Sequence, residues 1–254
     1  MRHRIAEPVI GRRRLPELRP ELEFALLARA LHRAGYDDEG LGHFVYRQPG
    51  GTLLANPFEC GWDELTPADV MRIDLDGNVL AGDWTVSPAT RLHLELLARR
   101  DDVIVSIHNH PRWATVWADA KLVPPIFDQT GATVGDDLVL LDEYTGSVDQ
   151  PINASAAVDA LDDASSMLLA NHGVLVTGAS VQEAHLRAVT LEWRCRRAWE
   201  VRSIAPDAEP LAADTVEYVR REVASGRRTP AWEFAVRREL RLDPALSPSD
   251  VDGC

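Results

Sequence analysis

The fold is decided by the stretch SPATRLHLELLARRDDVIVSIHNHPRW, which runs from Ser87 to Trp113. Ser87 followed by Pro88 predicts a helix start, because serine caps a helix N-terminus and proline suits the first helical position. Leucines spaced three and four residues apart then give this helix one apolar face. The run from Val103 to Ile107 is rich in β-branched residues and is bounded by charge and proline, which predicts a strand. A helix therefore leads into a strand, and the end of that strand carries two histidines.

These two histidines are His108 and His110. Because side chains at i and i+2 of a strand point the same way, both face one side and Asn109 faces the other. The pair can hold one metal ion, although one core histidine beside one surface histidine gives the same pattern. His172 lies in a tight Asn-His-Gly turn between two apolar strand segments, where Gly173 allows the backbone to approach another group closely.

A buried imidazole needs a partner. His172 could bond to the backbone of its own turn, or it could share a metal ion with His108 and His110. Three neutral nitrogens would leave positions open for substrate, as catalytic metal sites do. The sequence therefore predicts a candidate metal site formed by these three histidines.

Composition limits the classes of function. The chain has 254 residues, enough for one large domain or two small ones, and a net charge of −13. That charge argues against nucleic acid or an anionic membrane as a partner, since both need a positive surface. Cys60, Cys195 and Cys254 form no CxxC pair, which suits a reducing cytoplasm. No apolar run approaches the ~20 residues that span a bilayer, and the first residues lack the apolar core of a secretory signal. We therefore expect a cytoplasmic protein.

Short strands and helices alternate along the rest of the chain. Helices are expected over residues 21–34, 113–120, 158–165, 180–201, 215–224 and 230–240, and strands within 41–58, 70–80, 103–107, 137–141, 167–170 and 174–176. This mixture predicts an α/β sandwich in which helices cover a largely antiparallel sheet. We expect a basic, flexible arm over residues 1–20, a metal-binding domain over 21–204 and a C-terminal helical extension over 205–254.

Several motifs, in this order, resemble the class II aldolase/adducin family. They are GHFVYR, LLANPF followed by TPADV and DLDG, LH…RRDDVIVSIHNH, and LLANHGVLVTG followed by a helix containing EA. The resemblance covers roughly Glu21 to Glu200, and the later AWEFAVRRELRLDP is similar to the family's C-terminal helix.

The resemblance implies a three-layer α/β/α sandwich of the nine-stranded type. It also implies a homo-oligomer, often a tetramer with active sites between subunits, and a divalent metal ion on His108, His110 and His172. Zinc is the default metal, but three imidazoles also suit Fe(II), Mn(II) or Co(II).

Two departures from the family pattern bear on function. The family's sugar-phosphate enzymes carry Ser-Ser-Glu before the helix, and their acid/base glutamate corresponds here to Ala89, counting back from His93. They hold phosphate with that serine pair and with a GNxS segment, where this chain has Pro88, His43 and Val45. The substitutions affect both the usual proton shuttle and phosphate recognition, and they resemble the adducin-like branch, whose members are partly non-enzymatic.

Five further residues are candidates for the site. Asp128 lies in the segment PPIFDQTGA, and in related enzymes the loop here places a proton-transferring residue at a neighbouring subunit's metal. We therefore expect Asp128 to be the acid/base, with an Asx-type turn as the alternative. We expect His43, Asn56, Ser87 and His93 to contact substrate or to support the ligands.

These inferences favour a metal-dependent lyase that performs aldol cleavage or decarboxylation on a small, non-phosphorylated oxo- or hydroxy-acid. The metal ion would act as a Lewis acid on substrate oxygens. One alternative is a non-haem iron oxygenase on the same fold. Another is an adducin-like interaction module that kept its histidines without turnover.

Overall fold

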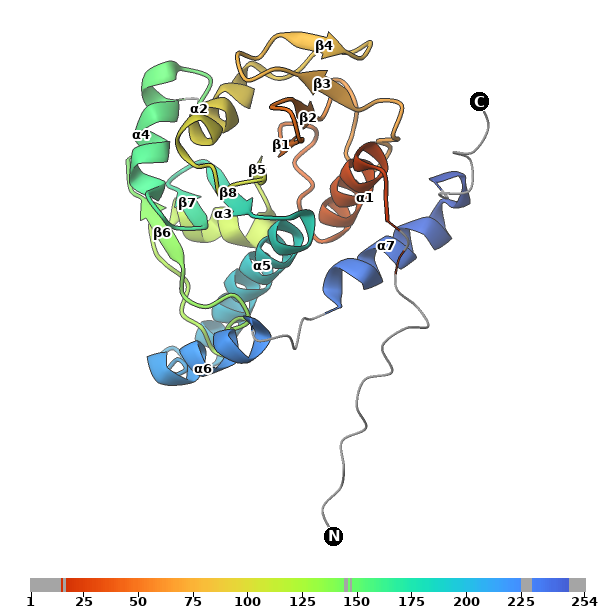
Figure 1. Ribbon diagram of the computed structural model, residues 1–254. Coiled ribbons are helices and arrows are strands. Elements are labelled where there is room, and N and C mark those ends of the chain that lie inside the picture. The colour runs from red at the N-terminus through yellow and green to blue at the C-terminus, as the bar shows by residue number, and fades with distance from the viewer. Residues whose placement is uncertain (1–14, 16, 144–145, 147, 225–229, 247–254) are drawn as a thin grey trace.

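Eight strands form a single sheet in the computed structural model, which describes residues 15, 17–143, 146, 148–224 and 230–246 (Figure 1). The strands are β1 (His43–Arg47), β2 (Leu53–Ala55), β3 (Met71–Ile73), β4 (Val79–Ala81), β5 (Val105–Asn109), β6 (Leu138–Leu141), β7 (Ser166–Leu169) and β8 (Gly173–Gly178). They lie in the order β4-β3-β2-β1-β5-β8-β7-β6, and every neighbouring pair is antiparallel except β6 and β7. The predicted largely antiparallel sheet is confirmed, with eight strands in the described residues where the resemblance implies nine.

Helices cover both faces of this sheet (Figure 1). They are α1 (Pro20–Arg33), α2 (Arg91–Arg99), α3 (Arg112–Asp119), α4 (Pro151–Leu161), α5 (Val181–Ile204), α6 (Ala213–Ala224) and α7 (Ala231–Leu242), with 3-10 turns η1 (Pro88–Thr90) and η2 (Pro244–Leu246). One apolar cluster joins α2 and α4 to the sheet, and another joins α1, α3 and α5 to it, with α7 packed on α1 and α5. The predicted α/β/α sandwich is therefore confirmed.

Alternation along the central strands decides which side chains face which layer. On β5, Ile107 belongs to the apolar cluster of α1, α3 and α5, so His108 faces the layer of α2 and α4. On β1, Val45 belongs to the cluster of α2 and α4, and His43, two residues earlier, faces the same way. His43 and His108 are paired in register between the two strands. The fold thus brings both histidines to one face of the sheet.

The helix predicted over residues 158–165 is wrong in its limits. α4 begins at Pro151 and ends at Leu161, after which Asp162 has a φ of 49° and the chain enters β7 at Ser166. Proline at the first helical position marks this start. Apolar residues lie on most sides of this helix rather than on one face alone, so the sequence shows no clear periodic pattern there. The strand predicted from Val103 likewise begins two residues later, after a turn.

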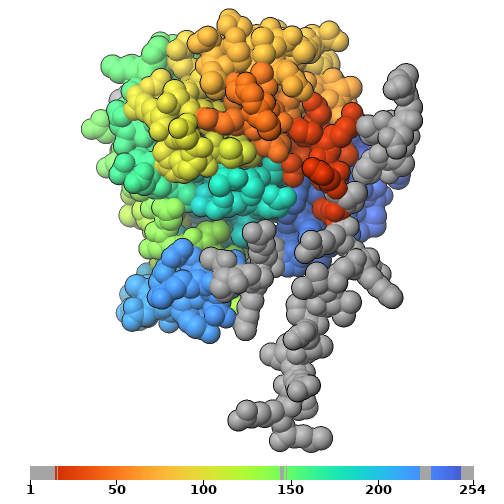
Figure 2. All heavy atoms as spheres, viewed as in Figure 1, coloured from red at the N-terminus to blue at the C-terminus, as the bar shows by residue number. Residues whose placement is uncertain are grey.

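The long helix predicted from Ser180 is α5, which continues to Ile204 rather than ending near Val201. The Ser180 hydroxyl accepts the Glu183 N–H at 3.2 Å, as a capping serine does. Beyond it, α6 projects from the main body (Figure 2).

The predicted arm lies mostly outside the described residues, and so do residues 247–254. None of the helices described is long and apolar enough to cross a membrane.

Candidate metal centre

Three histidines meet where β5 ends and β8 begins. His108 lies in β5, His110 follows that strand directly, and His172 occupies the turn between β7 and β8. One ring nitrogen of each lies within 4.8 Å of those of the other two, and the three ring centres are 4.7 to 5.0 Å apart. His108 is buried and the other two are half-buried.

Close packing of β5 on β8 brings the turn histidine to the other two. Asn109 pairs with Val174 at the beginning of β8. A Cβ atom on Gly173 would lie 2.4 Å from Cδ2 of His110 and 2.5 Å from the Asn109 carbonyl oxygen. Both distances are far shorter than the 3.5–4.0 Å of favourable carbon contacts. The group that the backbone of Gly173 approaches is therefore a candidate metal ligand.

Oxygen acceptors hold the Nδ1 atoms of two of these histidines. His108 Nδ1 donates to the Val174 carbonyl oxygen at 2.9 Å, and His110 Nδ1 donates to the Asp38 carboxylate at 3.2 Å. A proton fixed on Nδ1 leaves the lone pair of a neutral imidazole on Nε2, the atom then available to a metal ion. Nε2 of His110 is buried and has no hydrogen-bond partner among the described residues. A buried nitrogen without a partner destabilises the fold, and a bound metal ion would supply the missing partner.

The donor set fits a divalent ion. Nitrogens bound to one tetrahedral zinc ion at about 2.1 Å lie about 3.4 Å apart, so modest ring rotations would close the observed cluster to ligating distance. Burial, with His110 nearby, lowers the pKa of His172 to about 4. Burial and the surrounding histidines hold the pKa of His108 well below its usual range. Both rings are therefore neutral near pH 7, and neutral imidazole is the form that binds a metal.

A second pair of buried histidines extends the cluster toward α2. The rings of His43 and His108 are 4.8 Å apart. His43 Nδ1 lies 2.8 Å from Nε2 of His93, whose Nδ1 lies 2.7 Å from the Ser106 hydroxyl oxygen. Nε2 of His93 also lies 3.1 Å from the His43 carbonyl oxygen, which can only accept, so this nitrogen carries the proton. Burial and His93 hold the pKa of His43 well below its usual range. Neutral His43 then accepts at Nδ1 and offers an Nε2–H donor.

Asn56 and Ser87, two of the predicted site residues, bond to the backbone around this pair. Asn56 Oδ1 accepts the Phe44 N–H at 2.8 Å, and its amide nitrogen donates to the Gly42 carbonyl oxygen at 3.3 Å. Asn56 therefore holds the backbone on both sides of His43. Ser87 accepts an N–H of its own turn at 3.2 Å and so caps η1.

Asp128, the predicted acid/base, lies in the loop between α3 and β6 and bonds to α5. Its carboxylate accepts the Trp193 indole N–H at 2.8 Å and lies 3.4 Å from Nε of Arg197. It also accepts the Gly131 N–H of its own loop at 2.7 Å, which is a local turn contact of the kind expected as the alternative. None of these contacts is with the histidine cluster, so Asp128 does not join the cluster within one described chain. Ala89 lies in η1, which packs against β1.

Asp38 is a site residue that the sequence patterns do not reveal. It accepts Nδ1–H of His110 at 3.2 Å, the backbone N–H of His110 at 3.3 Å and the Gly42 N–H at 3.0 Å. Burial alone would raise the pKa of Asp38, but these hydrogen bonds outweigh it and leave the pKa below its usual value. Asp38 belongs to the polar turn after α1, where no sequence pattern distinguishes it from the adjacent Asp37.

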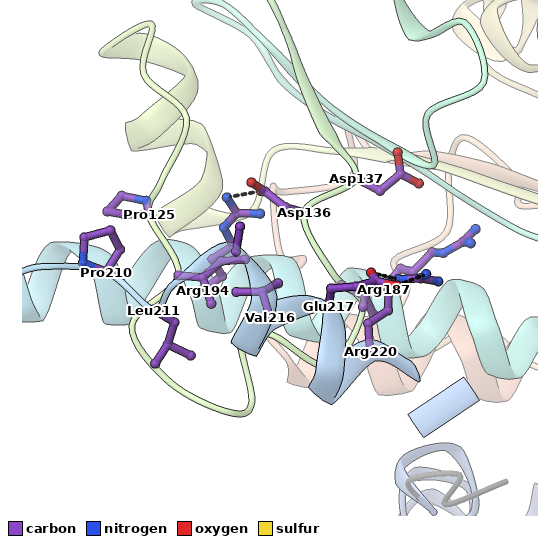
Figure 3. Close-up of a pocket in the computed structure, with 13 residues that line it drawn as sticks. Pro125, Asp136, Asp137, Arg187, Arg194, Pro210, Leu211, Val216, Glu217 and Arg220 are labelled. Carbon is purple, nitrogen blue, oxygen red and sulfur yellow. Dashed lines mark hydrogen bonds and ion pairs between the residues drawn. The ribbon is translucent and has the colours of Figure 1, made fainter. Parts of the chain in front are cut away.

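A cavity of about 570 Å³ lies away from the histidines, between α5, α6 and residues 125–137. Figure 3 shows Arg194 directed at Asp136 and Arg220 beside Glu217, at 2.7 Å in each case. Both contacts are ion pairs, and none of the described residues that line the cavity is a histidine. We therefore centre the functional site on the histidines.

Known proteins share this sequence pattern and fold. Residues 22–199 match the family model described as Class II Aldolase and Adducin N-terminal domain. A 4-hydroxy-3-prenylphenylpyruvate oxygenase/4-hydroxy-3-prenylbenzoate synthase from Streptomyces roseochromogenus subsp. oscitans is 29% identical over 248 residues, 91% of this chain and 89% of that protein. A 5-methylthioribulose-1-phosphate/5-deoxyribulose-1-phosphate aldolase from Rhodospirillum rubrum is 30% identical over 209 residues, 81% of this chain and 92% of that protein.

Among solved structures, an aldolase II superfamily protein from Pseudomonas syringae has a TM-score of 0.77 at 22% identity. The likeness covers 89% of this chain and 96% of that one. At this identity the likeness bears on the fold alone, and it agrees with the three layers described above.

Proposed function

The chain belongs to the class II aldolase and adducin family, and from this premise we propose that it is a metal-dependent lyase acting on a small, non-phosphorylated oxo- or hydroxy-acid. The observation that carries the proposal is the cluster of His108, His110 and His172, whose nitrogens lie within 4.8 Å of one another. When bound there, a divalent ion, zinc by default, would supply Lewis-acid chemistry to substrate oxygens.

His43 would contribute a hydrogen-bond donor beside the metal. Its Nδ1 accepts from His93, so its Nε2 carries the proton and would be the donor to a substrate oxygen. Asn56 fixes the backbone on both sides of this residue. The ring is thus held in one orientation, as preorganised binding of a carboxylate or carbonyl oxygen requires.

Phosphorylated sugars should be poor ligands. Where the family's sugar-phosphate enzymes have phosphate-binding side chains, this chain has Val45 and Pro88, neither of which offers a side-chain donor. The net charge of −13 adds an unfavourable field for a dianion. The Rhodospirillum relative is named for phosphorylated sugars and the Streptomyces relative for a phenylpyruvate, an oxo-acid. The substitutions favour the second class of substrate.

Cleavage of a carbon–carbon bond leaves a carbon that must be protonated, and Ala89 cannot provide that proton. We assign this role to Asp128 of a neighbouring subunit, because the family resemblance places a proton-transferring residue of this loop there. Within one chain, Asp128 contacts α5 and not the histidines. Decarboxylation needs only one proton returned, which slightly favours it over aldol cleavage.

An iron-dependent oxygenase is the second candidate. The Streptomyces relative carries an oxygenase name and matches 91% of this chain. A site of three imidazoles with open positions also suits Fe(II). The same substrate class would then be cleaved with consumption of oxygen.

Purification without added metal, followed by metal analysis, reloading and assay against a panel of oxo- and hydroxy-acids in an oxygen electrode, tests these alternatives. Cleavage without oxygen uptake supports the lyase, and cleavage coupled to oxygen uptake supports the oxygenase. A metal-loaded protein without turnover on the whole panel would favour the adducin-like module. Micromolar binding of fuculose- or ribulose-phosphate in calorimetry would contradict the assigned substrate class.

A further inference from the structure

We propose that Asp38 is a positioning residue that fixes the orientation and tautomer of His110 and thereby sets the affinity of the site for its metal ion. This inference rests on the proposed function, because it takes His110 to be a ligand. It adds a role for a residue outside the histidine cluster.

The contacts of Asp38 with His110 bridge two distant segments. Oδ2 of Asp38 lies 3.2 Å from His110 Nδ1 and 3.3 Å from the His110 backbone nitrogen, across 72 residues of sequence. The side chain of Asp38 is 8% exposed and that of His110 is 21% exposed. Two bonds from one oxygen to one residue restrain both its ring and its backbone.

The chemistry of the acceptor selects one tautomer. An ionised carboxylate can only accept hydrogen bonds, so it favours the proton on Nδ1 of His110 and the lone pair on Nε2. Nε2 is the buried atom without a hydrogen-bond partner in the described residues, on the side of the ring away from Asp38. Carboxylates that orient a ligating histidine in this way typically change metal affinity 10- to 100-fold when they are replaced.

The same carboxylate also reaches β1. Its second oxygen, Oδ1, accepts the Gly42 N–H at 3.0 Å, directly before His43. A side chain at Gly42 would collide with the Asn109 amide at 2.0 Å, so the two strand ends are in close contact here. Asp38 therefore ties the end of β5, with His110, to the start of β1, with His43.

The test is the replacement Asp38→Asn, with Asp37→Asn as the matched control. Asp37 is the adjacent aspartate, is 55% exposed and pairs with His32 instead. Zn(II) and Co(II) dissociation constants would be measured by competition with a chelator, together with the visible spectrum of the Co(II) proteins. We expect roughly 10- to 100-fold weaker binding and an altered spectrum for Asp38→Asn, and wild-type behaviour for Asp37→Asn.

A readout without metal separates positioning from general damage to the fold. In ¹⁵N-histidine NMR of the metal-free protein, His110 should carry its proton on Nδ1 in the wild type and lose this preference in Asp38→Asn. A further variant, Asp38→Glu, keeps an acceptor-only side chain and should recover part of the affinity.

The failure of this inference differs from the failure of the proposed function. Wild-type protein that binds neither metal ion would overturn the proposed function, and the role of Asp38 with it. Wild-type binding together with unchanged affinity, spectrum and tautomer in Asp38→Asn would overturn the role of Asp38 alone.

Discussion

The candidate metal centre depends on the absence of a side chain at Gly173. A Cβ atom at this position would lie 2.4 Å from the His110 ring and 2.5 Å from a carbonyl oxygen of β5. Because the backbone oxygen cannot rotate away, Gly173→Ala should separate β5 from β8 and displace His110. We expect a loss of about 1–3 kcal/mol in unfolding free energy, the usual cost of overpacking, and weaker metal binding.

Gly61→Ala is the matched control for that substitution. Its Cβ atom would meet Asp63 Oδ1 at 2.8 Å, the end of an exposed side chain that can rotate. Urea unfolding and chelator competition on both variants provide the comparison. Equal stability and equal metal affinity in the two variants would show that the approach of Gly173 to His110 does not matter.

The proton donor is a second question at the residue scale. If Asp128 is the acid/base, Asp128→Asn should lower the turnover rate by about 10²- to 10⁴-fold in metal-loaded protein, once a substrate is found. Asp142→Asn is the control, since Asp142 is an exposed loop aspartate that pairs with Lys121. Unchanged turnover in Asp128→Asn would remove this residue from the mechanism.

Residue patterns in the sequence predict the candidate ligands better than they predict the groups that contact them. The HxH spacing and the Asn-His-Gly turn indicate His108, His110 and His172, which the structure brings together. Asp38 is not predicted, because its role depends on a contact 72 residues away. The contact between His93 and Ser106 is not predicted either, because it forms only when α2 packs on β5.

The packing of α5 on α7 contains a buried histidine that should make the protein acid-sensitive. His185 is 4% exposed and its ring contacts that of Trp232 in a tilted arrangement, with ring centres 5.3 Å apart. Its Nδ1 has no hydrogen-bond partner among the residues described. Burial, with a contribution from Arg238, lowers the pKa of His185 to about 4.

The sign of the pH effect follows from this shift. Between pH 6.5 and about 4, His185 binds a proton in the unfolded protein but not in the folded protein. The unfolding free energy is therefore unaffected by His185 above pH 6.5 and decreases as the pH falls through this window. The difference of about 2.5 pKa units corresponds to about 3 kcal/mol. His185→Phe keeps an aromatic ring beside Trp232. Between pH 7 and pH 4.5 its unfolding free energy should therefore fall by about 2–3 kcal/mol less than that of the wild type.

Urea unfolding at the two pH values measures this difference directly. The buried histidines of the metal centre contribute equally in variant and wild type, so the comparison isolates His185. His32→Phe, at a partly exposed position on α1, is the control and should follow the wild type. The same pH dependence in His185→Phe and wild type would contradict the account of this helix contact.

Elements with strong end signals are predictable from the sequence, and elements without them are not. Ser180 and Glu183 locate the start of α5, and the Asp76-Gly77 pair locates the turn between β3 and β4. The limits of α4 are not predictable in this way, because apolar residues lie on most of its sides and give no clear periodic pattern. The parallel pairing of β6 with β7 depends on the path of α4 over the sheet, which no local pattern indicates.

At the scale of the whole molecule, the C-terminal half of α5 and the neighbouring α6 carry exposed large apolar side chains. Trp193, Trp199, Ile204 and Tyr218 are all exposed, and α6 projects from the main body (Figure 2). Apolar surface of this kind marks sites of association. We expect a homotetramer of about 112 kDa, four times the chain mass of 28.1 kDa, assembled through this region.

Sedimentation equilibrium of two isoleucine variants tests that expectation. Ile204→Arg lies at the end of α5, whereas Ile152→Arg lies at the start of α4 in the opposite layer, and both positions are highly exposed. We expect a smaller assembly for Ile204→Arg and the wild-type mass for Ile152→Arg. A wild-type protein that sediments as a 28.1 kDa monomer would rule out an active site shared between subunits.

The central claim is that His108, His110 and His172 hold one divalent ion. Metal analysis of the wild-type protein and of His108→Ala and His172→Ala, purified identically without added metal, tests it most directly. The account predicts about one ion per wild-type chain and a loss of most of it in both variants, because two imidazoles bind far more weakly than three. Full metal content in both variants would contradict the assignment.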